Sequence, residues 1–443
     1  MSTMCVPRLV GALLVACVAV APPVSAQEPP AHEHPSPDAV PAAQHEHGAA
    51  VPALFSTRDA SGTAWLPAVT PMHGVHRQAR GWDVMLHGNG YVQLLHEAAP
   101  EHRGATQAGS INWLMAMARR PLGGGSVGFR SMISLEPWTI PGCGYPNLLA
   151  TGEVCEGDTI HDKQHPHDLF MEIAAEIDRP LAGALRWQLY GGLAGEPALG
   201  PPGFPHRISA MPNPLAPITH HWLDATHITF GVLTSGVYGG RWKAEGSLFN
   251  GREPDERRYN LDLARLDSVA GRLWFLPTET LALQVSAGRL HEAEPAHAGE
   301  PAINVTRVTA SATRHRRFGD GGHLWATTAA WGANREARET THGLMLESSL
   351  SVSGRHTWFG RLEVNGKPAH DLHIHEASGV FTVGKLQGGY THYLSTAGGW
   401  NPGIGASASA AVVPPALEPR YGGVGLGVGI FVTLRPAAHE MGR

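Results

Sequence analysis

The sequence predicts an all-β protein, a single antiparallel transmembrane β-barrel of about 16 strands. Three observations predict this fold. Apolar and polar residues alternate with a period of two from Trp82 onward, as strands with two unlike faces require. The alternating runs are roughly ten residues long, the length that a tilted strand needs to cross a bilayer. Short turns and longer loops alternate between the runs, which places the two kinds of connection at opposite ends of a barrel.

The composition supports many strands and excludes one class of partner. The 443 residues include 54 glycines and 12 tryptophans, and only 16% are charged, which suits strands joined by tight turns. A formal net charge of -5 provides no basic face, so no nucleic-acid partner is expected. After the N-terminal apolar stretch no run of 18 apolar residues occurs, which excludes a helical membrane protein.

Residues 1–26 are predicted to be a signal peptide. Arg8 supplies the positive charge, residues 9–20 form the apolar region, and small residues precede a cleavage site after Ala26. Export from the cytoplasm follows. The alternative is a lipoprotein signal that ends at Cys17, but the apolar residues continue past that cysteine.

Residues 27–80 are predicted to be a disordered, His- and Pro-rich periplasmic segment, because they show neither strand nor helix periodicity. Imidazoles in a flexible tract can capture Cu(II), Ni(II) or Zn(II) loosely. The alternative is a soluble tether that happens to contain histidine. The candidate ligands stand in two short repeats and are His32, His34, His45 and His47.

The predicted barrel covers residues 81–435 and is followed by a tail of residues 436–443. Its charged mid-strand residues, such as Lys243 and Glu363, fit a wet lumen opposite a lipid-facing surface. A soluble propeller or sandwich, the alternative, would repeat its blade or hairpin motifs, and the sequence contains no such repeat. The last strand shows two unlike faces most clearly, one of them formed by Val424, Leu426, Val428, Ile430, Val432 and Leu434.

The connections between the strands differ in length. Short turns, for example at residues 120–124 and 277–279, are expected to face the periplasm, and the longer loops are expected to be extracellular. The longer loops lie near residues 96–108, 137–166, 196–222, 251–262, 291–303 and 366–378.

The signal peptide, the two-faced strands, the alternating loop lengths and the glycine-rich last strand at residues 421–434 resemble a bacterial outer-membrane β-barrel of the porin-like kind. The resemblance covers residues 80–435. It implies an outer-membrane location, the lipid bilayer as partner, and small solutes as cargo. One departure is that the chain continues past its last strand, whereas such barrels usually end there on an aromatic residue. The His-rich exported segment gives a weaker resemblance to copper-resistance outer-membrane proteins.

Two cysteines remain after cleavage at Ala26, Cys143 and Cys155. An even pair in an exported protein predicts a disulfide, and two free thiols are the alternative.

Two His-rich loops on the same side of the predicted barrel are the candidate metal site. They would bring together three or four imidazoles and a carboxylate, enough to bind Zn(II) or Cu(II) as a cofactor or cargo. The alternative is a hydrogen-bonded loop that plugs the pore. The candidate ligands are His161, His165, His167 and Asp168 in the first loop, and His206, His220, His221 and His227 in and after the second.

The sequence therefore favours passage or binding of small solutes, with copper or zinc ions as candidates, and no enzymatic activity. One alternative is a barrel-embedded hydrolase acting on lipids or esters, for which Ser209, Ser247 and Ser286 are candidate nucleophiles, although no nucleophile-elbow motif surrounds them. The other alternative is a structural outer-membrane protein with a plugged lumen.

Overall fold

The computed structural model describes residues 55–101, 103–294, 302–320, 322–336, 339–374 and 376–439. The predicted signal peptide, the four histidines of the N-terminal repeats and residues 440–443 lie outside the described residues. No helix in the described residues is long and apolar enough to span a membrane.

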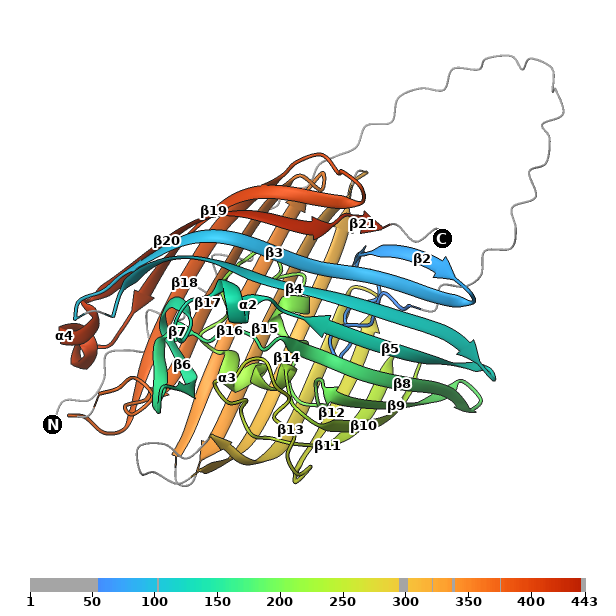
Figure 1. The fold of residues 1–443 in the computed structure, drawn as a ribbon, viewed down its shortest axis with the longest axis horizontal. Helices are drawn as coiled ribbons and strands as arrows, with labels where there is room; N and C mark the ends of the chain where they lie inside the picture. The colour runs from blue at the N-terminus through green and yellow to red at the C-terminus, as the bar shows by residue number, and fades with distance from the viewer. Residues whose placement is uncertain are drawn as a thin grey trace, which may run out of the picture. The chain divides into compact units, whose positions relative to one another are not determined.

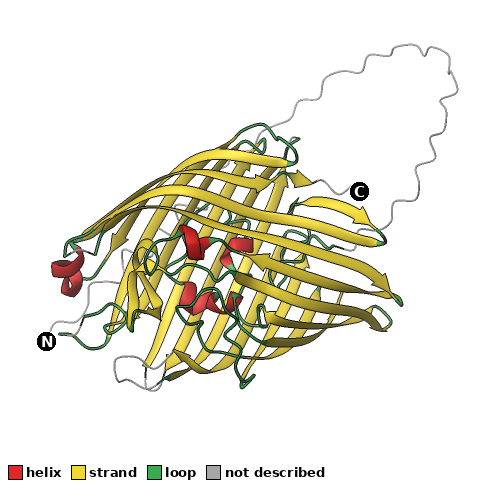
Figure 2. Ribbon diagram, viewed as in Figure 1, coloured by secondary structure: helices red, strands yellow, loops and turns green. Residues whose placement is uncertain are grey.

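Sixteen antiparallel strands form a closed barrel, as the sequence predicted (Figures 1 and 2). Each strand pairs with the next along the chain, and the last strand pairs with the first to close the ring. The barrel strands are β3 (Trp82–Ala98), β4 (Ala105–Leu122), β5 (Gly125–Ile133), β8 (Phe170–Ala182), β9 (Leu185–Ala194), β10 (Val232–Gly239), β11 (Trp242–Phe249), β12 (Ser268–Thr278), β13 (Leu281–Glu294), β14 (Ile303–Phe318), β15 (His323–Glu336), β16 (Glu339–Val352), β17 (His356–Pro368), β18 (Val380–Tyr393), β19 (Trp400–Val412) and β20 (Val424–Pro436).

The remaining elements lie in the connections and near the two ends of the described chain. They are β1 (Met72–His73), β2 (Val75–Ala79), α2 (Glu136–Thr139), β6 (Tyr145–Cys155), β7 (Asp158–Gln164), η1 (Phe204–His206), α3 (His220–Leu223), η2 (Ala225–His227), η3 (Pro415–Leu417), α4 (Glu418–Tyr421) and β21 (Ala438–His439).

The predicted alternation of loop lengths is confirmed. Residues 123–124, 183–184 and 279–280 are short turns at one end of the barrel, which is the periplasmic end in outer-membrane proteins. The long connections at residues 134–169 and 195–231 belong to the other end, and both enter the lumen (Figure 1).

The predicted two faces of the last strand are also confirmed. Its apolar side chains point outward and are about half exposed, from 46% at Leu434 to 62% at Ile430. The alternate residues Phe431 and Thr433 face inward and are buried. An exposed apolar face on a closed ring is the lipid-facing surface of a membrane barrel.

Replacing Ile430 by lysine is expected to lower the free energy of unfolding by about 2–4 kcal/mol, because the charge would lie near the middle of the lipid-facing surface. Leu434→Lys, two residues from the end of the same strand, is the matched control and should cost about 0–1 kcal/mol. Urea titration in lipid vesicles measures both values. Equal effects at the two positions would contradict the assigned lipid-facing surface.

The N-terminal segment (residues 55–71) differs from the prediction, which placed the whole of residues 27–80 in a disordered segment outside the barrel. Trp65 and Leu66 are buried against wall residues including Trp274. The Lys243 ammonium donates to the Thr63 carbonyl, and Arg130 donates to the Ala60 carbonyl at 2.9 Å. The segment is ordered because buried cations on the wall need acceptors, and its backbone supplies them.

Within the predicted tail, Pro436, Ala438 and His439 also belong to β-strands. β20 continues to Pro436, and β21 pairs with β1, while β2 pairs with the first residues of β3. The paired strands therefore begin before the predicted barrel boundary at residue 81 and continue past residue 435.

The inner loop (residues 195–231) crosses the lumen and is fixed by charges of the wall. Arg207 is fully buried and pairs with Asp224 of the same loop and with Glu347 of β16 at 2.7 Å. Arg361 of β17 lies 3.2 Å from Glu347 and donates to the Leu215 carbonyl at 2.8 Å. The mid-strand charges are therefore neutralised by the inner loop rather than solvated by a water-filled pore.

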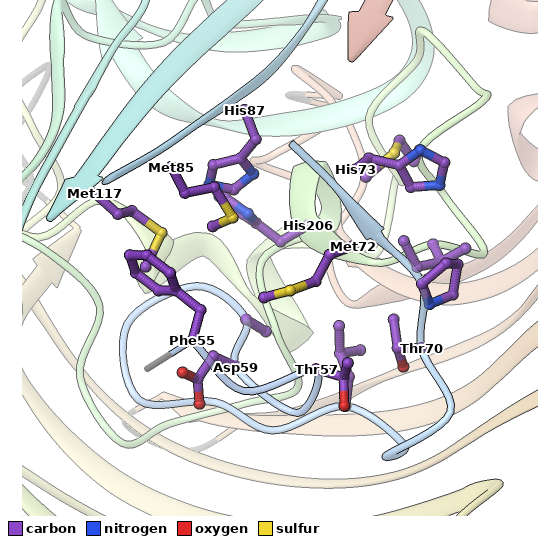
Figure 3. A pocket seen from close by; sticks show the side chains of 15 residues that line it. Phe55, Thr57, Asp59, Thr70, Met72, His73, Met85, His87, Met117 and His206 are labelled. Carbon is purple, nitrogen blue, oxygen red and sulfur yellow. The ribbon is translucent and has the colours of Figure 1, made fainter. Parts of the chain in front are cut away.

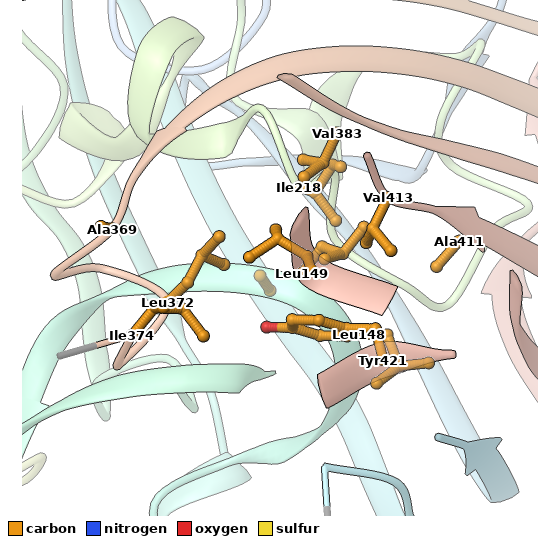
Figure 4. Packing of buried hydrophobic residues seen from close by; sticks show 12 residues of the cluster. Leu148, Leu149, Ile218, Ala369, Leu372, Ile374, Val383, Ala411, Val413 and Tyr421 are labelled. Carbon is orange, nitrogen blue, oxygen red and sulfur yellow. The ribbon is translucent and has the colours of Figure 1, made fainter. Parts of the chain in front are cut away.

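The β6–β7 hairpin fills the lumen toward the long-loop end. The predicted disulfide is present between Cys143 and Cys155 and ties the start of this hairpin to the end of β6. Lys385 of β18 donates to Asn147 at 2.8 Å and lies 3.1 Å from Glu97 of β3. An apolar cluster joins the hairpin to the inner loop and to two further connections (Figure 4), through Leu148, Leu149, Ile218, Leu372, Val413 and Tyr421.

Candidate metal site inside the barrel

The two His-rich loops meet in the lumen. One ring nitrogen from each of His165, His220 and His221 lies within 4.8 Å of the other two. The centroid of the His165 ring lies 6.0 Å from that of His220 and 5.8 Å from that of His221. The centroids of the His220 and His221 rings are 5.2 Å apart. These three residues are called the imidazole site.

Local structure explains how the three rings converge. The helix α3 carries two of them in succession, and Thr219 before it donates from its backbone N–H and its hydroxyl to Glu363 at 2.9 and 2.8 Å. Gly152 of the hairpin has a positive φ of 120°, and a Cβ there would lie 2.3 Å from the His221 ring. Glycine is therefore required where the hairpin backbone passes that imidazole.

A carboxylate lies beside the Nδ1 atom of each ring. Asp224 lies 2.9 Å from His220 Nδ1, and Glu253 lies 2.9 Å from His221 Nδ1. Glu153 lies 3.2 Å from His165 Nδ1. Carboxylates in this position orient metal-binding histidines and present the opposite nitrogen to the ion. The opposite nitrogens of His165 and His221 are buried and have no hydrogen-bond partner among the described residues.

Burial keeps two of these imidazoles neutral at physiological pH. It lowers the pKa of His220 to about 4, although Asp224 favours the protonated ring. Burial and the nearby Arg258 guanidinium lower the pKa of His165 well below its usual range. Neutral imidazole is the form that binds a metal ion, so no proton has to be removed first.

Arg207 controls the charge of the carboxylate behind His220. Burial by itself would raise the pKa of Asp224, but the Arg207 guanidinium and the His220 imidazole hold that pKa below its usual range. Asp224 therefore remains an anion in the lumen. A carboxylate anion is the acceptor that keeps the proton on His220 Nδ1.

An acidic cavity adjoins the imidazole site at the long-loop end. It has a volume of about 30 Å³, enough for one ion or water molecule, and His221 forms part of its wall. Burial raises the pKa of Glu153 to about 8, so a cation that enters the cavity would bind as this carboxyl group gives up its proton. The carboxylates that line this cavity belong to Glu153, Glu253, Glu294, Glu336 and Asp371.

His167 and His227 extend the imidazole site into the lumen. The His227 ring lies 5.1 Å from His220 and 5.4 Å from His167. His167 Nδ1 is 2.9 Å from Glu136, and the Nε2 atom of His227 is buried without a hydrogen-bond partner among the described residues. These two histidines therefore border the imidazole site on its lumen side.

The structure places the other three predicted ligands elsewhere. His161 lies 3.0 Å from Asp162, and its ring is 4.5 Å from that of His373. Asp168 is held by Arg258 at 3.4 Å, and burial raises its pKa to about 6. His206 lines a different cavity, where its ring is 5.7 Å from His87.

Sequence reasoning missed the carboxylates Glu153 and Glu253 beside the histidines. Glu253 lies in a different connection from His221, and Glu153 lies on the opposite strand of the β6–β7 hairpin, 12 residues before His165, so no short spacing signals either pair. It also missed the methionines at the lumen face of β4. Met115 and Met117 stand two residues apart on one face, and this period-two pattern was the available signal.

The candidate serine nucleophiles have partners other than imidazoles. Ser209 donates to Glu347 at 2.8 Å, Ser247 accepts from the Ala198 N–H at 2.7 Å, and Ser286 accepts from the Gly200 N–H at 2.9 Å. A hydrolytic serine requires a base within hydrogen-bond reach. These bonds give the hydrolase alternative no support.

No family model matches the sequence, and no curated protein matches it either. Solved structures that align with it include bacterial outer-membrane proteins. An anion-selective porin from Comamonas acidovorans is 13% identical, with 80% of this chain and 99% of the porin covered and a TM-score of 0.46. OmpF of Salmonella typhi, solved with daunomycin, is 9% identical, with 81% and 100% covered and a TM-score of 0.48. OprB of Pseudomonas putida is 10% identical, with 80% and 94% covered and a TM-score of 0.47.

The closed ring of sixteen strands and its exposed apolar face define a transmembrane β-barrel of the outer-membrane type. At these identities and TM-scores the aligned porins carry no argument about the cargo of this chain. The weaker resemblance to copper-resistance outer-membrane proteins receives no support from the structures named above.

Proposed function

We propose that the protein binds a transition-metal ion, Cu(II) or Zn(II), at the imidazole site in its lumen, and that it handles such ions at the outer membrane. The observation that carries this proposal is the arrangement of His165, His220 and His221: three converging imidazoles, each with a carboxylate at Nδ1. Imidazole nitrogen suits both ions, and three protein ligands leave a position open for a further ligand.

The size of the internal cavities supports an ion rather than a larger solute. Four cavities inside the barrel have volumes of about 70, 30, 20 and 100 Å³. Pockets for drug-sized organic ligands are about 300–1,000 Å³. The acidic cavity beside His221 offers a cation a route from the long-loop end, which is extracellular in barrels of this kind.

The test is the metal content of the detergent-purified mature protein without residues 27–54, measured by elemental mass spectrometry. That deletion removes the four histidines of the N-terminal repeats. We expect one tightly held Cu or Zn ion per chain, and loss of that ion when His165, His220 and His221 are all replaced by alanine.

The matched control replaces three histidines outside the imidazole site, His96, His291 and His392, by alanine and should keep the ion. Heat-dependent migration in gel electrophoresis shows whether each variant is folded. A folded protein that remains empty after incubation with either ion would favour the structural alternative, a barrel with a plugged lumen.

A further inference from the structure

A second cavity lies in the lumen between the N-terminal segment, β3, β4 and the inner loop. Its volume is about 70 Å³, and it lies toward the short-turn end, where β2 pairs with β3 and β1 pairs with β21. Its lining is rich in sulfur and imidazole, supplied by Met72, Met85, Met117, Met211, His73, His87 and His206. This cavity is called the thioether pocket.

The thioethers share one space. Figure 3 shows Met72, Met85 and Met117 turned toward the same region, next to the imidazoles of His87 and His206. Gly74 follows β1, and a Cβ built there would lie 3.1 Å from the Met85 sulfur. The absence of that side chain lets the thioether lie directly against the backbone between the two short strands.

A purely apolar filling explains only part of this arrangement. Methionine often fills irregular gaps in a core, and further methionines pack behind the pocket at Met115, Met132 and Met171. Seven of the 11 methionines in the chain thus gather here. Filling an apolar gap does not require imidazoles, however. The buried His87 Nε2 and His73 Nδ1 atoms have no hydrogen-bond partner among the described residues.

The imidazoles are held in place by aromatic contacts rather than by carboxylates. The Trp113 ring lies 4.7 Å from His206 and 5.2 Å from His87. Asp59, the carboxylate that lines the pocket, is paired with Arg119 at 2.6 Å. The donors available to a ligand are therefore neutral sulfur and nitrogen atoms, in contrast to the carboxylate-backed imidazole site.

We propose that the thioether pocket binds a soft monovalent metal ion, Cu(I) or Ag(I), through Met72, Met85 and Met117 with His87 or His206 as the nitrogen ligand. Thioether sulfur selects Cu(I) over harder divalent ions, and the pocket has room for a single bare ion. This second site goes beyond the proposed function and does not depend on it, because its donors are separate from His165, His220 and His221.

The test is Ag(I) binding to the full mature chain in detergent, with Ag(I) counted by elemental mass spectrometry after desalting. We expect the Met72→Leu/Met85→Leu/Met117→Leu variant to hold one Ag(I) fewer per chain than the unaltered protein. Leucine nearly conserves the volume of methionine, so the pocket should remain filled. The control Met132→Leu/Met171→Leu changes two buried methionines behind the pocket and should keep the full count.

The two metal sites are distinguished by testing each variant with the ion of the other site. Replacement of His165, His220 and His221 should leave the Ag(I) difference intact, whereas the methionine variant should keep its Zn(II). An unchanged Ag(I) count in the methionine variant, or an equal loss of Ag(I) in the methionine control, would refute the proposal that the thioether pocket binds a metal ion. Neither result would bear on the imidazole site.

X-ray absorption of the Cu(I)-loaded, unaltered protein provides a test that does not require any variant to fold. Cys143 and Cys155 are joined in a disulfide, so sulfur scattering at the copper would come from methionine. Sulfur neighbours support the proposal, and a spectrum with only nitrogen and oxygen neighbours refutes it.

Discussion

Replacing residues 196–228 of the inner loop by a short Gly-Asn linker is expected to raise the ion conductance of the barrel by about an order of magnitude or more. Barrels of 16 to 18 strands leave an aqueous channel when nothing fills them. Here the inner loop crosses that space beside the β6–β7 hairpin and the N-terminal segment, and it is bonded to the wall through Arg207, Thr219 and Leu215. Gly195 and Thr229 already form a β-bridge, so a short linker can close the hairpin between β9 and β10.

Single-channel recording in planar bilayers measures this change. The matched control shortens the connection at residues 394–399, which is exposed and outside the lumen. It should conduct like the unaltered protein. Porin-sized conductance in the unaltered protein, with no increase on removal of the inner loop, would show that the loop does not obstruct the pathway and would favour passage of larger solutes.

The barrel could be predicted from the sequence because its signals are local. Alternation within a strand and the length of the next turn depend only on neighbouring residues, so the strand pattern and the sidedness of the loops followed directly. The contents of the lumen could not be predicted in the same way. Arg207 and Glu347 are 140 residues apart in the chain, and Asn213 and Gln387 are 174 apart.

The candidate site was likewise predictable only in the part that depends on local signals. Alternating loop lengths placed His165, His220 and His221 on one side of the barrel, and the structure brings them together. The same reasoning could not separate His161 from the others. The neighbouring Asp162 is held at 2.7 Å by Arg103 of the connection between β3 and β4, and no sequence spacing encodes this contact.

Replacing Arg207 by leucine is expected to lower the free energy of unfolding by about 3–5 kcal/mol, the range for removal of one partner from a buried ion pair. Its guanidinium is fully buried between Asp224 and Glu347. Loss of the cation leaves two carboxylates, of which Glu347 keeps Arg361 and Asp224 keeps only the neutral His220 as a side-chain partner among the described bonds.

The matched control is Arg252→Leu, which removes a partly exposed arginine paired with Asp267 at 3.0 Å. It should cost about 0–1 kcal/mol, because exposed ion pairs contribute little. Urea titration in vesicles compares the two variants. Equal decreases in the free energy of unfolding would mean that the charges in the lumen are solvated. The inner loop would then not be held in place by these ion pairs.

The Arg207→Leu substitution should also weaken metal binding at the imidazole site. Without Arg207, Asp224 loses the cation that keeps it ionised, and the proton acceptor behind His220 becomes weaker. Loss of such a supporting carboxylate typically lowers metal affinity about 10–100-fold. A competitive Zn(II) titration on folded Arg207→Leu protein should show this decrease, whereas Arg252→Leu should not. Unchanged affinity in a destabilised variant would separate the two roles and confine Arg207 to holding the inner loop in the barrel.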